Sequence, residues 1–129
     1  MVNEIRLTVM LCGTAICRWI GGFDGLLEAL VFFMIVDYIT GLFCAIVEKT
    51  LSSAVGFKGI LQKCLIILLV GTANIIDQHI LEGSEQLLRT AVIFFYLSNE
   101  GISILENSAR LGLPVPDKLR QILEQVRQR

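Results

Sequence analysis

Charged side chains are scarce in this sequence. They make up 18% of the 129 residues, compared with about 25% in typical soluble domains. The formal net charge is -1, and Lys and Arg form no block away from the C-terminal tail. Because nucleic-acid binding depends on a basic patch, we expect no nucleic-acid partner. Intrinsic disorder is excluded as well, since it requires low hydrophobicity together with a high net charge.

Residues that carry catalysis or bind metals are also few. The only histidine, His79, has no cysteine or serine partner nearby. The sequence contains no phosphate-binding loop, no Gly-rich dinucleotide motif, no zinc-protease motif and no nucleophile elbow. No C-x-x-C pair is present, so neither a zinc site nor a disulfide framework is expected at Cys12, Cys17, Cys44 and Cys64. The sequence therefore predicts a protein that is not an enzyme and uses no cofactor or metal.

Apolar residues are abundant instead. They make up 54% of the chain, and the mean hydropathy is +0.70. A chain this short has too much surface for its volume to bury so many apolar side chains in a water-facing monomer. A helix that crosses a bilayer needs about 20 mostly apolar residues, and suitable segments run over about residues 5–23, 26–47, 60–76 and 87–105. The sequence therefore predicts an all-α membrane protein with three to four transmembrane helices.

The first of these segments is the weakest, because it is short and Arg18 interrupts it. Its apolar run has the length of a signal peptide. However, Glu4 interrupts the region before it, and Arg18-Trp19 follows where small residues should mark a cleavage site. We therefore expect the segment to be retained. It either crosses the membrane as a fourth span or lies on the membrane surface, which leaves three spans and an external N-terminus.

The positions of Lys and Arg near the helix ends predict the orientation, because these residues concentrate in cytoplasmic loops. The connection after the second segment contains Lys49 and Lys58, whereas residues 77–86 contain acidic side chains and no Lys or Arg. The tail after the fourth segment is also basic, with Arg110, Lys118, Arg120, Arg127 and Arg129. The sequence therefore predicts a multi-pass membrane protein with a cytoplasmic C-terminus.

A break in the helical pattern separates the tail from the rest of the chain. Residues 111–116 read Leu-Gly-Leu-Pro-Val-Pro and form a linker after a transmembrane bundle of residues 1–110, because Gly and Pro end helices. Residues 117–129 are expected to form an amphipathic cytoplasmic helix, whose apolar stripe consists of Leu119, Ile122, Leu123 and Val126. This stripe suits the inner membrane surface or the tails of sister subunits; a solvated, partly formed helix is a third alternative.

Polar residues inside the apolar segments are the candidates for a functional site. An ionisable group at the bilayer centre costs about 2.5–3.5 kcal/mol on insertion scales, so such groups usually face protein or water. On the second segment Asp37, Gly41 and Ala45 recur at i, i+4 and i+8, a small-residue stripe that favours close packing of helices and of subunits in a homo-oligomer. On the third and fourth segments helical spacing groups the polar candidates, which are Lys63, Asn74, Glu100, Ser103 and Asn107.

Two interpretations of these polar residues remain open. In the first, each polar group holds one helix to another within a compact bundle. Lys63 and Glu100 lie at similar depth and could pair, and Arg18 and Glu28 could pair near the outer side. In the second, some of these groups face a water-filled pore that forms when copies of the chain assemble.

Three stretches of the chain follow a recognisable pattern. The run Asp-Tyr-Ile-Thr-Gly at residues 37–41, with Ala45, is followed by Ser53, Gly56, Gly59 and Lys63. Residues 98–107 read Ser-Asn-Glu-Gly-Ile-Ser-Ile-Leu-Glu-Asn and precede the linker at 111–116, after which the last helix begins with Asp-Lys-Leu. From about Leu26 onward, the chain therefore resembles the toxin-secretion and phage-lysis holin family.

The resemblance implies a holin. Such proteins collect in the bacterial cytoplasmic membrane, assemble with copies of themselves and open the membrane at a set time. The opening releases an endolysin for host lysis or, in some relatives, a large toxin without a signal peptide. The family is known for neither an enzyme activity nor a cofactor.

The residues alone leave two other functions open. One is a small multidrug-type, proton-coupled exporter, in which Glu28 or Asp37 serves as the membrane carboxylate. Against it, the first segment carries Arg18 and no carboxylate at mid-depth. The other is an antiholin-like membrane regulator, which shares every feature above and differs only in failing to permeabilise the membrane alone.

Overall fold

The computed structural model describes residues 1–83 and 85–128, apart from the side chains of residues 123 and 126–128. Within this part of the chain the regular structure is helical, so the predicted all-α fold is confirmed. The helices are α1 (Val2–Ile20), α2 (Gly25–Val47), α3 (Ser53–His79), α4 (Leu87–Arg110) and α5 (Asp117–Gln128).

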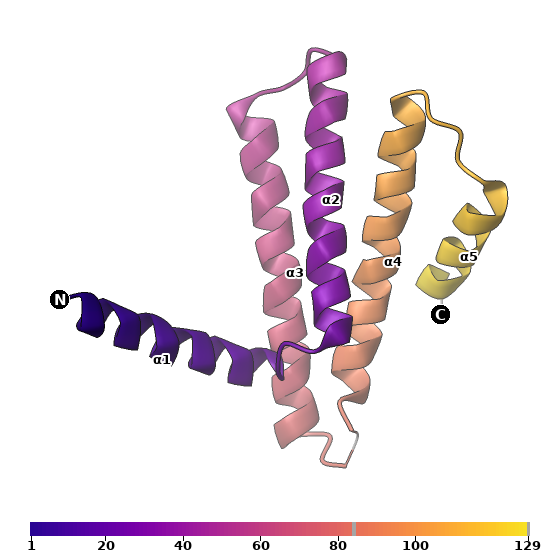
Figure 1. Ribbon diagram of the computed structural model, residues 1–129. Helices are drawn as coiled ribbons and strands as arrows, with labels where there is room; N and C mark the ends of the chain where they lie inside the picture. The colour runs from indigo at the N-terminus through magenta and orange to yellow at the C-terminus, as the bar shows by residue number, and fades with distance from the viewer. Residues whose placement is uncertain (84, 129) are drawn as a thin grey trace.

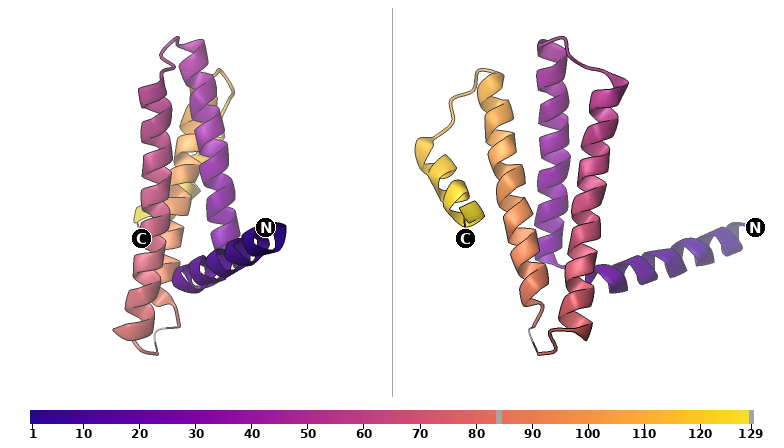
Figure 2. Two further views of the ribbon diagram at one scale, coloured as in Figure 1. Left: turned by 90° about the vertical axis from the view of Figure 1, so that its left-hand side faces the viewer. Right: turned by 180° about the vertical axis from the view of Figure 1, so that it is seen from behind.

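Helices α2, α3 and α4 lie side by side in an up-and-down bundle (Figure 1). Helix α1 leaves the bundle crosswise, and α5 folds back beside α4 in both views that show it clearly (Figures 1 and 2). One end of the bundle, here called the basic end, holds the α2–α3 connection with Lys49 and the end of α4 with Arg110. The opposite, acidic end holds the α3–α4 connection with Glu82 and Glu85.

Local signals explain where the helices begin and end. Asp24 caps α2 by accepting a hydrogen bond from the backbone N–H of Leu27 at 2.9 Å, and Ser52 caps α3 in the same way. Helix α1 ends at Ile20 rather than at residue 23, because Gly21 adopts a left-handed conformation with φ of 94°. Helix α3 extends beyond the predicted residues 60–76 at both ends. Its backbone hydrogen bonding begins at the Ser52 cap and continues past the apolar stretch into a polar last turn.

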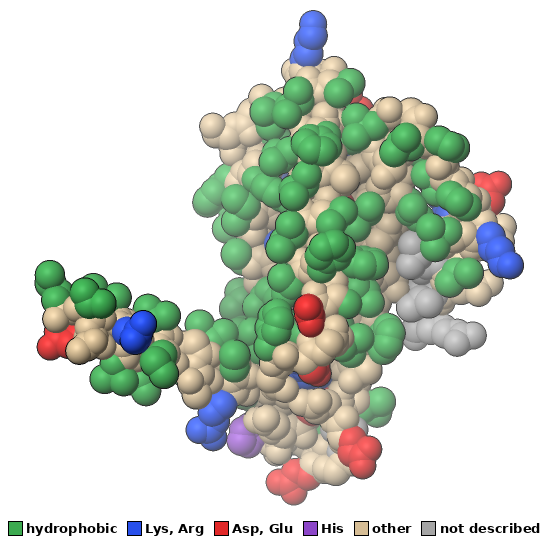
Figure 3. All heavy atoms as spheres, viewed as in Figure 1, with side chains coloured by type: hydrophobic (Ala, Val, Ile, Leu, Met, Phe, Trp, Pro, Cys, Tyr) green, Lys and Arg blue, Asp and Glu red, His purple; other side chains and the backbone are tan. Residues whose placement is uncertain are grey.

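The apolar side chains of the bundle face outward as well as inward. Among the described residues, α2 and α3 are long and apolar enough to cross a membrane, by length and composition. Only 22% and 28% of their most apolar stretches are buried, whereas the core helix of a soluble protein would be mostly buried. Figure 3 shows hydrophobic side chains spread over this outer face. Inside, the core is centred on Leu27, Leu30, Val70 and Ile93.

Helix α1 touches the bundle mainly through its last turn. The ring of Trp19 lies directly over Gly71 of α3, where an added Cβ would come within 2.0 Å of the Trp19 ring. No side chain larger than hydrogen fits at position 71 unless this ring moves. The absence of a side chain at Gly71 thus fixes the point at which α1 meets α3.

Replacing Gly71 with Ala is therefore expected to lower the free energy of unfolding by about 1–3 kcal/mol, the usual effect of overpacking. The measurement is a denaturant titration in detergent micelles, followed by the fluorescence of Trp19, the only tryptophan. Gly13→Ala is the matched control, because nothing lies within 4 Å of a Cβ at that helical position. Equal stability of the two variants would show that the contact between Trp19 and Gly71 does not hold α1 in place.

Candidate functional site

Three charged side chains from three different helices meet inside the bundle. The ammonium of Lys63 on α3 lies 2.8 Å from Oδ2 of Asp37 on α2 and 3.0 Å from Oε2 of Glu100 on α4. The side chains of Lys63, Asp37 and Glu100 are 18%, 13% and 9% exposed. Together with Asn107 they are called the charged cluster below. One cation thus links all three helices of the bundle.

Asn107, two turns after Glu100 on α4, extends the charged cluster toward the basic end. Its amide nitrogen donates to Oδ1 of Asp37 at 3.2 Å and to the hydroxyl of Thr40 at 2.9 Å. Its backbone carbonyl accepts a hydrogen bond from Sγ of Cys44 at 3.3 Å. Both carboxylate oxygens of Asp37 therefore have a donor, one from α3 and one from α4.

The small-residue stripe of α2 lies in the same region. A Cβ at Gly41 would lie 3.8 Å from the amide nitrogen of Asn107, an ordinary contact, and Ala45 is only 6% exposed. Asp37, Gly41 and Ala45 thus lie inside the bundle of a single chain, with Asp37 and Gly41 against α4. The small residues Gly41 and Ala45 allow close helix packing within the single chain, and packing of this stripe between subunits stays a prediction.

Tyr38, next to Asp37, packs against the beginning of α3. Its hydroxyl donates to the carbonyl of Gly56 at 3.3 Å. A Cβ at Gly59 would come within 3.1 Å of the ring, tighter than most real contacts, so the glycine leaves room for the tyrosine. Residues 37–41 and the Gly56–Lys63 segment are therefore in direct contact.

A small cavity of about 190 Å³ opens beside the charged cluster. Ser103 lines it together with Asp37, Lys63 and Asn107, so the structure brings Ser103 to the cluster. Within the described residues, no group of His, Cys, Asp or Glu side chains is arranged to hold a metal ion. The arrangement offers paired charge and hydrogen-bonding groups in an otherwise apolar bundle, with one more carboxylate than ammonium.

A second polar network lies at the acidic end and centres on Arg89 of α4, which is 1% exposed. Its guanidinium donates to the carbonyls of Ile20 at 2.6 Å and Gly22 at 2.8 Å, and to Oδ2 of Asp24 at 2.9 Å. These hydrogen bonds from Arg89 hold the pKa of the Asp24 carboxyl below its usual range. Arg89 therefore fixes the whole α1–α2 connection to α4.

Asn74 and Asp77 of α3 complete this Arg89 network. The amide of Asn74 donates to the carbonyl of Trp19 at 2.8 Å, at the end of α1. Asp77 accepts hydrogen bonds from the backbone N–H groups of Leu88 and Arg89 at 3.0 and 2.8 Å, so it caps the start of α4. Asn74 shares a helix face with Lys63 but lies about 16 Å away along α3, given 1.5 Å per residue. It does not join the charged cluster.

The sequence did not reveal the Arg89 network. Arg18 and Glu28, which could pair in one of the two interpretations, are both exposed and form no ion pair among the described residues. Asp24 pairs with Arg89 instead. The sequence did contain one indication of this network. Arg89 lies near the start of an apolar segment, and an arginine in that position needs a partner.

The apolar stripe of the tail is only partly visible. Leu119 and Ile122 are 44% and 49% exposed on α5. The side chains of Leu123 and Val126 lie outside the described residues, and so does residue 129 of the predicted tail helix.

The chain is similar to proteins of a known family. The chain matches the family model for the bacteriophage holin family over residues 14–128. The chain belongs to the bacteriophage holin family. A probable holin of Bacillus phage phi105 is 38% identical over 70% of this chain and 65% of its own length. The resemblance to holins drawn from the sequence is therefore confirmed.

Other relatives of this holin-family chain come from bacteria. The uncharacterized protein Lmo0128 of Listeria monocytogenes is 47% identical over 80% of this chain and 72% of its own length. An uncharacterized 14.9 kDa protein in the nagH 3' region of Clostridium perfringens is 38% identical over 98% of this chain and 95% of its own. No solved structure matches. Family membership and the apolar helices support a holin-type function at the membrane.

Proposed function

We propose that this chain is a holin of the bacterial cytoplasmic membrane. In this proposal it assembles with copies of itself and opens a timed hole that releases an endolysin or a large toxin without a signal peptide. The observation that carries the proposal is the charged cluster. A three-helix bundle with an apolar outer face encloses Asp37, Lys63 and Glu100, groups that a purely structural membrane bundle does not need.

The proposed arrangement has α2, α3 and α4 as membrane spans. Helix α2, with 23 residues, is about 35 Å long at 1.5 Å per residue, enough for a hydrocarbon core of about 30 Å. Helix α4 is more polar, but Arg89, Glu100 and Asn107 have partners on the neighbouring elements, which supports its crossing. The basic end is cytoplasmic by the distribution of Lys and Arg. Residues 1–110 then form the membrane unit, followed by the 111–116 linker and α5 on the cytoplasmic side.

The proposed mechanism exchanges contacts within one subunit for contacts between subunits. Helices in lipid associate through close packing and polar contacts, so the contact between α2 and α4 competes with contacts between copies. Separating α2 from α4 would expose Asp37, Glu100 and Lys63 to water and remove the energetic penalty of their burial. Moving one charge across the membrane potential is worth about 2.3 kcal/mol per 100 mV, so loss of potential can shift such a balance toward the open state.

Induced expression of the full chain in a bacterial host tests the proposal. Membrane potential, optical density and escape of a cytosolic reporter enzyme are followed with and without a co-expressed endolysin. A holin gives a sudden, timed loss of potential, with clearing of the culture when the endolysin is present. Steady growth with intact potential, at confirmed membrane abundance, contradicts the proposal. In that case increased drug tolerance would indicate an exporter, and suppression of a second holin would indicate a regulator.

A larger side chain between α2 and α4 is expected to make lysis begin earlier. In Gly41→Leu the Cβ would already lie 3.8 Å from the amide nitrogen of Asn107, so the larger side chain is expected to crowd Asn107 and to weaken the sealed bundle by about 1–3 kcal/mol. Lysis should then begin earlier at equal membrane abundance. Gly41→Ala is the matched control, because its Cβ makes only an ordinary contact, and it should lyse on the normal schedule. Unchanged or later lysis in Gly41→Leu would remove the contact between α2 and α4 from the mechanism.

A further inference from the structure

Helix α1 is almost free of the bundle. Ile20 is its only buried residue, and the rest of its 19 residues are exposed or half-buried. The helix runs crosswise to α2, α3 and α4 in all three views (Figures 1 and 2). It joins the bundle at the level where α2 begins, after the short turn from Gly21 to Asp24. If the bundle spans a membrane, α1 therefore lies parallel to the membrane plane at the acidic end.

The two sides of α1 differ in chemistry over its last two turns, whereas nearer the N-terminus Leu7 and Leu11 make both sides apolar. On the side toward the middle of the bundle, Ile16 and Ile20 border an apolar hollow whose other lining residues include Val31 and Ile67. By helical spacing, Ile5 and Val9 lie on the same face of α1, and both are more than half exposed. This face is positioned to meet acyl chains.

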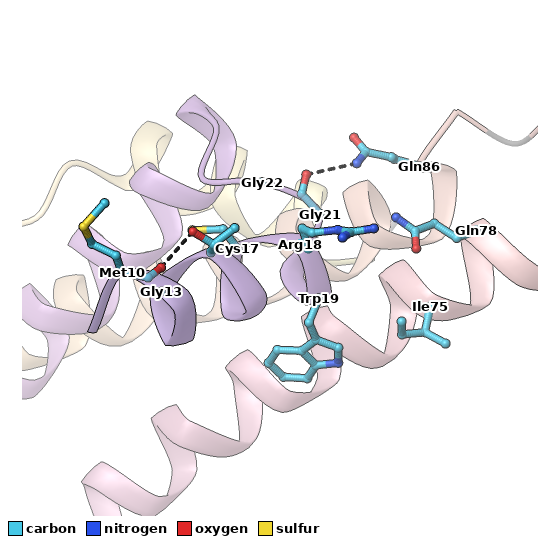
Figure 4. Close-up of a pocket in the computed structure, with 11 residues that line it drawn as sticks. Met10, Gly13, Cys17, Arg18, Trp19, Gly21, Gly22, Ile75, Gln78 and Gln86 are labelled. Carbon is cyan, nitrogen blue, oxygen red and sulfur yellow. Dashed lines mark hydrogen bonds between the residues drawn. The ribbon is translucent and has the colours of Figure 1, made fainter. Parts of the chain in front are cut away.

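The opposite side of α1 faces the acidic end. Thr14 and Arg18 border an open cleft of about 860 Å³ that Gln78 and Gln86 line from the other side. Figure 4 shows the Arg18 side chain extending toward Gln78, while Trp19 points toward α3. Arg18 is the only charged side chain in this lining, and it forms no ion pair among the described residues. Its guanidinium is free to meet the phosphates of lipid headgroups, which it binds well.

We infer that α1 lies flat in the outer surface of the membrane, with the Ile16 side in the acyl region and the Thr14–Arg18 side among the headgroups. The partner of this helix is thus the lipid surface. The crosswise course, the two faces and the attachment level carry the inference, which rests on the proposed spans of α2, α3 and α4. Trp19, at the junction of α1 with the bundle, suits the same depth, because tryptophan is enriched at membrane interfaces.

The test uses single cysteines in the full chain, after replacement of the four native cysteines by Ala. Spheroplasts that express Thr14→Cys or Ile16→Cys are treated with a membrane-impermeant maleimide before lysis begins. The inference predicts that Thr14→Cys reacts from outside and that Ile16→Cys, one half-turn away, does not. If neither reacts, α1 is buried in the bilayer; if both react equally, α1 stands away from the lipid. Either result overturns the inference.

Two further positions separate this inference from the proposed function. Glu82→Cys in the α3–α4 connection should react from outside, and Leu51→Cys in the α2–α3 connection should not; both positions are exposed. If Glu82→Cys does not react, or if Leu51→Cys does, the proposed spans are wrong. If they behave as expected while the α1 positions do not, the spans stand and only the placement of α1 is overturned.

Discussion

Exchanging the charges of Lys63 and Glu100 is expected to restore most of the stability that either single change removes. Lys63→Glu leaves three carboxylates together without their cation, and breaking a buried ion pair in this way costs about 3–5 kcal/mol. Glu100→Lys places two ammonium groups beside Asp37. The double variant again has one ammonium and two carboxylates in the cluster. For the double variant to be more stable than either single variant, the coupling energy between the two positions must exceed the loss in one single variant, so we expect a coupling of more than about 3 kcal/mol.

A double-mutant cycle measures this coupling, with unfolding of the four proteins followed by titration with a denaturing detergent. Glu106→Lys, at an exposed position on α4, is the control for an added lysine on this helix. It should leave the stability close to that of the unchanged chain. If the double variant is no more stable than the weaker single variant, the ion pairs of Lys63 do not hold the bundle together.

Loss of the Arg89 guanidinium is expected to be the most damaging change at the acidic end. In Arg89→Met the carbonyls of Ile20 and Gly22 lose their donor inside the protein, and Asp24 loses its cation. A hydrogen bond to a charged group contributes about 1.5–3 kcal/mol, so we expect a total loss of about 3–5 kcal/mol. Hydrogen exchange should show the same effect locally, as faster exchange at the end of α1 and the start of α2.

Arg110→Met is the matched control for this variant. Arg110 also pairs with a carboxylate, Glu48, but both side chains are exposed, at 50% and 42%. Exposed ion pairs contribute about 0–1 kcal/mol, so the control should be nearly as stable as the unchanged chain. Equal losses in the two arginine variants would show that burial of Arg89 adds nothing to the attachment of α1.

The helical periodicity of the sequence was enough to group the polar side chains that share a helix face. Lys63 and Glu100 could pair in one of the two interpretations, and the structure places their charged atoms 3.0 Å apart. The ion pair between Asp37 and Lys63 was not predicted, because the spacing of Asp37 with Gly41 and Ala45 suggested a packing stripe. Both descriptions apply, since Asp37 lies on the α2 face that meets α4 and also reaches Lys63.

The course of α1 could not be read from its residues. A run of apolar residues with a single arginine near its end is compatible with a span and with a surface helix alike. What fixes the direction of α1 lies far away in the chain: Gly71 under the Trp19 ring, Asn74 at the last carbonyls of α1, and Arg89 at the following turn. Hydropathy carries no information on such contacts, which join residues more than 50 positions apart.

Residues from all three stretches that carried the family resemblance are in contact with one another. Asp37 meets Lys63, Tyr38 meets Gly56 and Gly59, and Thr40 meets Asn107. Residues 37–41, the segment from Gly56 to Lys63 and the end of the run at 98–107 thus meet in one contact region around the charged cluster. A pattern recognised in separate stretches of sequence corresponds to a single place in the fold.

In the proposed mechanism, the polar interior of the bundle becomes exposed to water when the membrane opens. The most direct test of this mechanism is the reaction of Ser103→Cys, beside the charged cluster, with a membrane-permeant maleimide in an otherwise cysteine-free chain. A thiol reacts as the thiolate, which forms readily only where water is present. We expect Ser103→Cys to react slowly before lysis and fast after it. The rate at Ile35→Cys, on the exposed apolar face, should be the same before and after lysis. The same slow rate before and after lysis would contradict the account.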